Sequence, residues 1–300
     1  MVDKSASAKI GKVIEYLLLI ILAVLFLAPL LWVILTSFKT FNEIFTGTVK
    51  WFPTTWTLEN YQMAIQNYPL WTWTKNSAIV TLAVLLLSSV FCIMPAYGLA
   101  VTDFRGKTAL VFIMMASIMI PKELSAIYSY KIISKLGLLD TYAAMILPQL
   151  GEAIGVFLLY NFFCTIPKEF RESCELDGGG HMTALWRIYL PMAGPVISVM
   201  MILSFVSTWN NFFWPLIVTF TNKSMTLPVG LATIMNSVSE NSAARQYGLL
   251  MAISVLVSIP VLVLFISLQK QLSSLSRRAA SRDDPRPDSP ALSEFILTVL

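Results

Sequence analysis

Charged side chains are scarce in this chain: Asp, Glu, Lys and Arg together make up 13% of its 300 residues. Soluble domains carry about 25% charged residues, whereas here 56% of the residues are hydrophobic and the mean hydropathy is +0.71. The shortage of charge excludes an ordinary soluble domain. The net charge of +4 is too small to indicate a nucleic-acid partner, and it fits loops that lie against anionic lipid.

Cysteine and histidine are scarce as well. The three cysteines, Cys92, Cys164 and Cys174, are odd in number and two lie in or beside apolar runs, so they indicate small buried side chains and no disulfide framework. The single histidine, His181, has no companions for a metal site. No nucleophile motif or His/Cys/Asp cluster falls within the apolar runs, so the chain is predicted not to be an enzyme.

Long apolar runs, in contrast, are abundant. They match the roughly 20 residues needed to cross about 30 Å of hydrocarbon. The bilayer allows only helices there, because it offers no other partner for backbone N–H and C=O groups. The fold class is therefore an all-α polytopic membrane protein. The six predicted spans are residues 14–37, 77–101, 108–128 (interrupted at Pro121-Lys122-Glu123), 142–163, 192–219 and 246–268.

The two ends of the chain indicate its orientation. Three lysines precede the first run, which is too long for the apolar region of a signal peptide. Six spans put both termini on one side of the membrane, and the lysine-rich start indicates the cytoplasm. We expect a cytoplasmic N-terminus at 1–13, a transmembrane domain at 14–271 and a polar, Pro-rich, disordered cytoplasmic tail at 272–300.

A charged, glycine-centred stretch at 164–191 separates the fourth run from the fifth. Pro167 suits the start of a helix, and acidic residues follow in its first turn. We expect one short helix up to Leu176, a break at the three glycines that follow, and a second helix that ends at Leu190-Pro191. Such a helix–turn–helix would project from the membrane. A loop of amphipathic helices lying on lipid headgroups is the alternative.

Five residues in this stretch have a characteristic spacing: Glu172, Gly178, Ile188, Leu190 and Pro191. This spacing resembles the EAA loop of bacterial ABC-importer permeases, with two small residues in place of the alanines and an Asp before the Gly that is typical of sugar importers. Other segments are similar to the MalG-like, six-span permeases of carbohydrate importers: Thr57–Tyr61, Asn76-Ser77, Ala96-Tyr97, Asp103–Gly106, Met119–Pro121, Leu136–Thr141, Trp209-Asn210 and Gln246–Met251.

The resemblance covers about residues 13–271 and implies the type I ABC-importer permease fold. It implies a subunit that forms half of the path for a sugar or oligosaccharide in a bacterial inner membrane. The implied partners are a second, homologous permease, a cytoplasmic ATPase dimer that binds ATP and Mg, and an extracytoplasmic solute-binding protein; this chain would bind no cofactor. The alternatives are an importer of a non-sugar solute and an ion-coupled secondary transporter, for which only Glu152 fits an ion site.

The resemblance further implies that residues 172–191 dock in a groove of the ATPase. Glu172 would pair with a basic group there, and Gly178 would permit the sharp turn. Large apolar side chains would fill the groove, unless they face lipid or the chain's own spans. The expected coupling residues are Glu172, Ser173, Cys174, Leu176, Asp177, Gly178, Leu185, Trp186, Ile188, Leu190 and Pro191, of which Leu176, Leu185 and Trp186 are the groove-filling candidates.

The outer loop at about 220–245 is similar to a loop that enters the cleft of the binding protein. A polar loop without such a role is the alternative. The residues expected to serve as this binding-protein loop are Lys223, Pro228, Gly230, Asn236 and Glu240.

Polar side chains within the spans are candidates for the solute path. Trp209, Asn210 and Asn211 lie in the fifth run, where Trp could stack on sugar faces and amides could bond hydroxyls. They could equally form hydrogen bonds between helices. Glu152, near the middle of the fourth span, has the same two interpretations.

Overall fold

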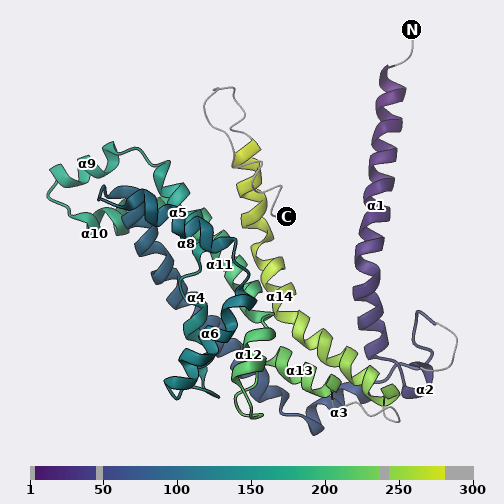
Figure 1. Ribbon diagram of the computed structural model, residues 1–300. Helices are drawn as coiled ribbons and strands as arrows, with labels where there is room; N and C mark the ends of the chain where they lie inside the picture. Colours follow the sequence, from purple (N-terminus) through teal and green to yellow (C-terminus); the bar gives the residue numbers. More distant parts are fainter. Residues whose placement is uncertain (1–3, 45–49, 237–242, 281–300) are drawn as a thin grey trace. The chain divides into compact units, whose positions relative to one another are not determined.

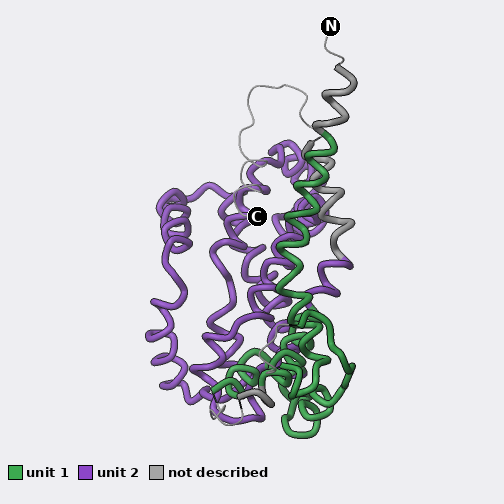
Figure 2. The backbone as a smooth tube through the Cα atoms, turned by 90° about the vertical axis from the view of Figure 1, so that its right-hand side faces the viewer, with its two compact units in different colours: residues 1–74, 227–260 green, residues 75–226, 261–300 purple. Residues whose placement is uncertain are grey.

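The computed structural model describes residues 4–44, 50–236 and 243–280 of the chain (Figure 1). Every regular element in these ranges is a helix. The chain divides into two compact units, which Figure 2 colours separately. The first comprises residues 1–74 and 227–260, and the second comprises 75–226 and 261–300.

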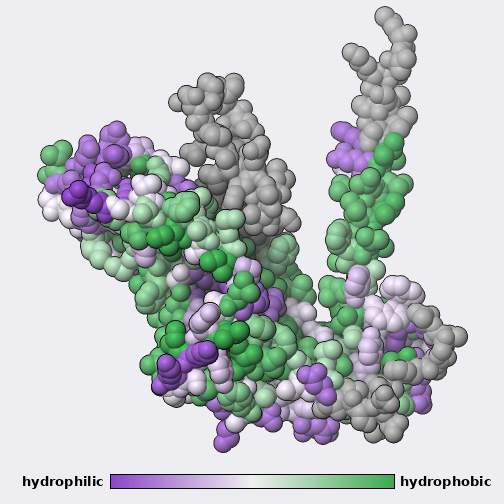
Figure 3. Space-filling view, viewed as in Figure 1, coloured by the Kyte–Doolittle hydropathy of each residue, from purple (hydrophilic) through white to green (hydrophobic). Residues whose placement is uncertain are grey.

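The first unit contains a long N-terminal helix and a small helical cluster. Its complete helices are α1 (Lys4–Ser37), α2 (Phe41–Ile44), α3 (Glu59–Asn67) and α13 (Leu227–Asn236). Apolar side chains cover the described part of α1 and most of them are exposed (Figure 3). A helix that is apolar all round is suited to lipid or to a partner helix, because water would not tolerate such a surface.

Two glycines allow close helix packing within the first unit. The Asn60 side chain in α3 donates hydrogen bonds to the carbonyls of Ser37 and Lys39, both at 2.9 Å. Gly248 lies directly against this amide, since an added Cβ would be 2.6 Å from Asn60 Oδ1. Gly230 of α13 lies equally close to the buried ring of Trp73, since an added Cβ would be 2.1 Å from Trp73 Cε3.

The second unit holds the remaining helices. Three of its candidate spans are interrupted by bends or short non-α turns. Its elements are α4 (Leu70–Val101, of which residues 70–74 belong to the first unit), α5 (Lys107–Ile118), α6 (Lys122–Lys135), α7 (Tyr142–Ile146), a 3-10 turn (Leu147–Gln149), α8 (Ala153–Cys164), α9 (Glu169–Leu176), α10 (His181–Ala184), a π-helical turn (Leu185–Tyr189), α11 (Leu190–Trp209) and α12 (Phe213–Val218), together with the distal part of α14 (Ala243–Ala280).

The main core of the second unit lies between α4, α8 and α11. Tyr97, Phe163 and Tyr189 form its centre, with Tyr97 and Phe163 edge-on to Tyr189 at centroid distances of 5.1 and 5.6 Å. Such aromatic pairs contribute about 0.5–1.5 kcal/mol beyond area burial. This core lies at the end of the spans that carries α9 and α10 (Figure 1).

Within the described residues, five helical segments are long and apolar enough to cross a membrane, and a bent pair of helices is a candidate for a sixth crossing. The pair is α5 and α6, which meet at 102° across Met119–Pro121. Pro121 lacks an N–H and disfavours helical geometry in the residue before it, which explains the break. The five continuous candidates are Lys12–Ser37, Leu70–Val101, Tyr142–Cys164, His181–Trp209 and Tyr247–Ser267.

Three expected boundaries differ from the structure. The fifth span was expected at 192–219, but its helix ends at Trp209 and α12 follows separately. The second helix of the charged stretch does not end at Leu190-Pro191; it continues through the π-helical turn into α11, since proline is tolerated in the first turn of a helix. The helix α14 continues to Ala280, beyond the start of the expected tail at 272, and residues 281–300 lie outside the described residues.

Candidate functional site

The turn between α9 and α10 has the geometry that glycine provides. Gly178 has φ of +81°, and its N–H donates to the Glu175 carbonyl at 3.0 Å. The N–H of Gly179 donates to the Cys174 carbonyl at 2.8 Å. These two bonds are those of a Schellman motif, which terminates a helix by placing a glycine in the left-handed region. The chain reverses here because of this motif, as the sequence predicts.

A second requirement at this turn is small size. A Cβ added to Gly179 would lie 2.5 Å from Cys174 Sγ and 3.0 Å from the Cys174 carbonyl oxygen. The end of α9 is therefore packed closely onto the turn. Packing within the chain therefore explains why residue 174 is small.

The surface of the region from α9 to the π-helical turn combines charged side chains with exposed large apolar ones, Phe170, Leu176, Met182 and Trp186 (Figure 3). Glu172, Ser173 and Asp177 are exposed. Leu176 is 89% exposed and Trp186 is 68% exposed. Apolar groups held out in this way are typical of a surface that a partner covers.

Leu185, in contrast, does not belong to this surface. It is only 3% exposed and is part of the core around Tyr97 and Tyr189, so the expectation that it fills a partner's groove is wrong. Ile188 and Leu190 are half-buried and pack against the same core. These three residues therefore anchor the loop on the spans.

His181 adds a polar anchor to the loop. Its Nδ1 lies 3.4 Å from the Tyr97 hydroxyl, and the two rings are edge-on with centroids 6.2 Å apart. The loop is thus tied to α4 as well as to α11. The sequence indicated only a surface position for this histidine.

The segment expected to enter a binding protein is mostly helical and apolar. Pro228 and Gly230 lie within α13, where Gly230 is buried against Trp73, so these two residues belong to a packed helix and not to a loop. Asn236 is exposed at the end of α13, and Lys223 is exposed in the preceding segment. Glu240 lies outside the described residues.

The segment 219–226, which precedes α13, is held by Asp140. The carboxylate accepts hydrogen bonds from the Phe220 N–H at 2.7 Å, from the Thr221 N–H and hydroxyl, and from the Ser224 hydroxyl. Partial burial disfavours the charged form, but the donors from Ser224, Phe220 and Thr221 outweigh it and hold the pKa of Asp140 below its ordinary value. Asp140 itself has φ of +62°, a conformation that Asp adopts more readily than most residues.

Asn76 holds the same segment from α4. Its amide donates to the carbonyls of Lys223 and Met225, both at 2.8 Å, and accepts from the Tyr142 hydroxyl at 2.6 Å. The buried amide is therefore satisfied, and the segment before α13 has a fixed course. The sequence offered only a resemblance at Asn76 and at the Leu136–Thr141 turn, with no indication that they meet the same loop.

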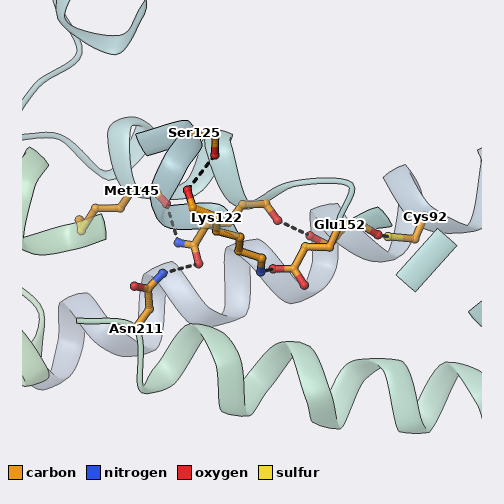
Figure 4. A network of polar contacts seen from close by, with 8 residues as sticks. Cys92, Lys122, Ser125, Met145, Glu152 and Asn211 are labelled. Carbon is orange, nitrogen blue, oxygen red and sulfur yellow. Dashed lines mark hydrogen bonds and ion pairs between the residues drawn. The ribbon is translucent and has the colours of Figure 1, made fainter. Parts of the chain in front are cut away.

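The residues proposed for the solute path fall at helix interruptions. Glu152 directly follows Gly151, whose φ is +69°, and it immediately precedes α8. Its Oε1 lies 2.5 Å from Lys122 Nζ at the start of α6 (Figure 4). The sequence identified Lys122 only as an interruption of the third run. A charged residue within an apolar run was the available signal.

The fifth-run residues have three different environments. Asn211 donates to Gln149 Oε1 at 3.0 Å and accepts from the Trp214 N–H at 3.3 Å, so it joins helices and begins α12. Asn210 is exposed. Trp209 is buried and its ring stacks on Phe205 at 5.8 Å, which favours packing between helices over contact with a sugar.

Comparison with known proteins agrees with this arrangement. Residues 93–278 match the family described as "Binding-protein-dependent transport system inner membrane component". The chain is 36% identical to the arabinooligosaccharides transport system permease protein AraQ of Halalkalibacterium halodurans, over 81% of this chain and 86% of that protein. It is 30% identical to the diacetylchitobiose uptake system permease protein NgcG of Streptomyces coelicolor, over 87% and 85% of the two chains.

A solved structure shares the fold. A chain of a bacterial ABC transporter involved in the import of the acidic polysaccharide alginate superposes with a TM-score of 0.79 at 25% identity, covering 90% of this chain and 99% of that chain. The likeness therefore extends over most of the chain.

Proposed function

Because the chain belongs to the family of binding-protein-dependent transport system inner membrane components, we propose that the solute it carries is an oligosaccharide. Family and fold make it a multi-pass membrane permease of an ABC importer, without catalytic activity of its own. The observation that supports an oligosaccharide most directly is the 36% identity with a permease of arabinooligosaccharides. An ion-coupled secondary transporter does not fit this family.

The exposed end of α9 is the proposed contact with a cytoplasmic ATPase dimer. Glu172 would pair with a basic group of that partner, and Leu176 and Trp186 would enter its groove. ATP and Mg would bind to the ATPase. Closure of the ATPase dimer on binding ATP would then favour one of two conformations of the spans, because ATP would bind the two conformations with different affinities.

The anchors of this loop suggest how such a movement would reach the spans. Leu185 and Tyr189 are buried in the core between α4, α8 and α11, and His181 contacts Tyr97 of α4. A displacement of α9 would therefore move packed helices together, because close-packed cores transmit strain. The small side chains of Ser173 and Cys174 would allow the ATPase to approach α9 closely, and the glycine turn would end α9 at this contact.

Orientation and the remaining partners follow from the same proposal. The α9–α10 loop and both termini would lie in the cytoplasm, as the lysine-rich start indicates. A second, homologous permease would complete the path. An extracytoplasmic binding protein would contact the segment that contains Lys223 and Asn236, both of which are exposed. Glu240 would belong to the same loop.

Uptake by the assembled importer tests the proposal. The chain would be purified with its ATPase, its partner permease and its binding protein, and reconstituted in vesicles that contain ATP. We expect ATP-dependent uptake of arabinotriose or diacetylchitobiose that requires the binding protein. Uptake of a non-sugar solute alone, under the same conditions, would contradict the oligosaccharide assignment.

A further inference from the structure

Three helix interruptions of the second unit meet at one place. They are the α5–α6 bend at Met119–Pro121, the break before α8 at Gly151-Glu152 and the break between α11 and α12 at Asn210–Phe212. The Lys122–Glu152 ion pair joins the first to the second, and the Gln149–Asn211 hydrogen bond joins the second to the third (Figure 4).

Helix lengths place this junction inside the membrane. The helices α5 and α8 pack against each other, and each has 12 residues. At 1.5 Å per residue each spans about 18 Å, compared with about 30 Å of hydrocarbon. With the other ends of these helices, Lys107 and Cys164, at the cytoplasmic surface as proposed above, Lys122 and Glu152 would lie at the same depth, roughly 12 Å inside the far surface of the hydrocarbon.

The two polar pairs at this depth differ in accessibility. Gln149 and Asn211 use their amides within the chain, since Gln149 also donates to the Met145 carbonyl at 2.6 Å and Asn211 accepts from Trp214. The ion pair is open on one side: the Lys122 side chain is 70% exposed, and that of Glu152 is 19% exposed. The amide pair thus braces the junction, and the ion pair is the part that a solute can reach.

An exposed ammonium at this depth indicates water or polar groups beside it. A charged residue in hydrocarbon is costly, so such residues almost always face a bundle interior or a water-filled cavity. The ion pair therefore offers one ammonium and one carboxylate to a solute.

We propose that Lys122 and Glu152 form a solute-contact site that favours neutral sugars over anionic ones. The ammonium has three donors and the pair uses one, so donors remain for sugar oxygens, while the carboxylate accepts from sugar hydroxyls. An anionic solute would have to displace Glu152 from Lys122, whereas a neutral sugar would not. This inference rests on the proposed import of oligosaccharides, and it contrasts with the structural neighbour, whose solute is an acidic polysaccharide.

Uptake of two matched arabinotriose derivatives tests the charge preference. The aldonate, with an oxidised reducing end, carries one carboxylate, whereas the alditol, with a reduced end, is equally open-chained and neutral. We expect Glu152→Gln to raise the aldonate-to-alditol uptake ratio of the reconstituted complex about fivefold to tenfold, since removing one charge near a contact shifts binding by about 1 kcal/mol or more. The binding protein is the same in all samples, so its own preference between the two derivatives affects the uptake ratios of wild type and variant equally.

The control variant is Asp103→Asn, which removes an exposed carboxylate paired with Lys107 at the opposite end of α5. It should leave the ratio unchanged. A wild-type complex that imports no oligosaccharide at all would contradict the proposed function. A complex that imports alditol normally while Glu152→Gln changes the ratio less than twofold would overturn the charge-selective site and leave the proposed function standing.

Thiol labelling of Lys122→Cys provides a measurement that does not depend on transport by the Glu152 variant. We expect a cationic, membrane-impermeant methanethiosulfonate to modify this cysteine, with slower modification in saturating arabinotriose. Mass spectrometry of the modified peptide would separate it from the three native cysteines. A cysteine that reacts only with a lipid-soluble maleimide faces lipid, and that result would overturn the site even if the Glu152 variant failed to assemble.

Discussion

The three consecutive glycines between α9 and α10 differ in what each position requires. Gly178 has a left-handed φ but open space around it, whereas Gly179 has ordinary φ but no room for a Cβ beside Cys174. Gly180 has neither restriction. The resemblance to the EAA loop predicted the turn at Gly178, and the structure confirms its conformation. The three glycines could not be distinguished from the sequence alone, because the contact that leaves no room for a Cβ at Gly179 is made with Cys174 of α9.

We predict that Gly178→Ala impairs the loop and Gly180→Ala does not. A Cβ in the left-handed region costs roughly 1–2 kcal/mol, which would distort the turn and reduce binding-protein-stimulated ATPase activity of the assembled complex. Gly179→Ala should reduce it too, because of the clash with Cys174. ATPase assays of the three variants, at equal complex content, provide the measurement. Equal activities for Gly178→Ala and Gly180→Ala would show that the φ of this turn has no functional role.

Asp140 supports a second prediction at the residue scale. Asp140→Asn keeps a residue that tolerates the left-handed region but weakens the bonds to Phe220, Thr221 and Ser224, and we expect a loss of about 1–3 kcal/mol. The pKa of Asp140 is lowered in the folded chain, so its stabilisation is complete above the unfolded value of about 4 and is lost as the pH falls through the folded pKa.

Thermal unfolding of the purified chain in detergent would check this. The difference in Tm between wild type and Asp140→Asn should be largest at pH 7 and should shrink at pH 3.5. A difference that is the same at both pH values would mean that the carboxylate charge does not hold the segment 219–226.

At the scale of elements, hydrophobic runs predict spans well and helix ends poorly. The all-helical membrane fold and the interruption at Pro121 were predictable, because length, apolar content and proline determine them. The end of α11 at Trp209 was not, since the run stays apolar and the break depends on Asn211 bonding to Gln149 and Trp214. The same limit applies to Leu185, whose burial depends on the distant core around Tyr97.

The helix α13 shows an error of another kind. Its sequence is apolar but only ten residues long, so it is too short for a span and was expected to be part of the outer loop at about 220–245. The structure buries it through Gly230 against Trp73. A short apolar segment between two spans therefore indicates a helix packed at the membrane surface or within the protein.

We predict that Gly230→Ala destabilises the first unit. The added Cβ would lie 2.1 Å from Trp73 Cε3, and overpacking of this kind typically costs about 1–3 kcal/mol. The control is Gly98→Ala in α4, where nothing lies within 4 Å and a helical alanine is favoured over glycine. Unfolding of both variants in detergent should give shifts of Tm in opposite directions. An unchanged Tm for Gly230→Ala would show that α13 does not pack on Trp73.

At the scale of the whole molecule, the chain is one part of a larger machine. The described part of α1 exposes apolar side chains over most of its surface, while Leu176 at the end of α9 and Trp186 in the π-helical turn are exposed as well. The first surface suits a membrane and the second suits a partner protein. We propose that the solute contacts the chain where helices break, at Lys122 and Glu152, and that ATP binds to another subunit. The central claim is therefore one of coupling: α9 transmits the state of an ATPase to spans that carry an oligosaccharide.

The most direct measurement is ATPase activity of the purified complex with arabinotriose and the binding protein, comparing wild type, the double variant Glu172→Ala/Gly178→Asp and the control Asp103→Ala. Co-purification of all subunits would be measured in parallel. We expect sugar-loaded binding protein to stimulate ATPase activity in the wild type and in the control, and we expect this stimulation to be lost in the double variant. An intact complex whose stimulated activity is unaffected by the double variant would contradict the assignment of α9 as the coupling element.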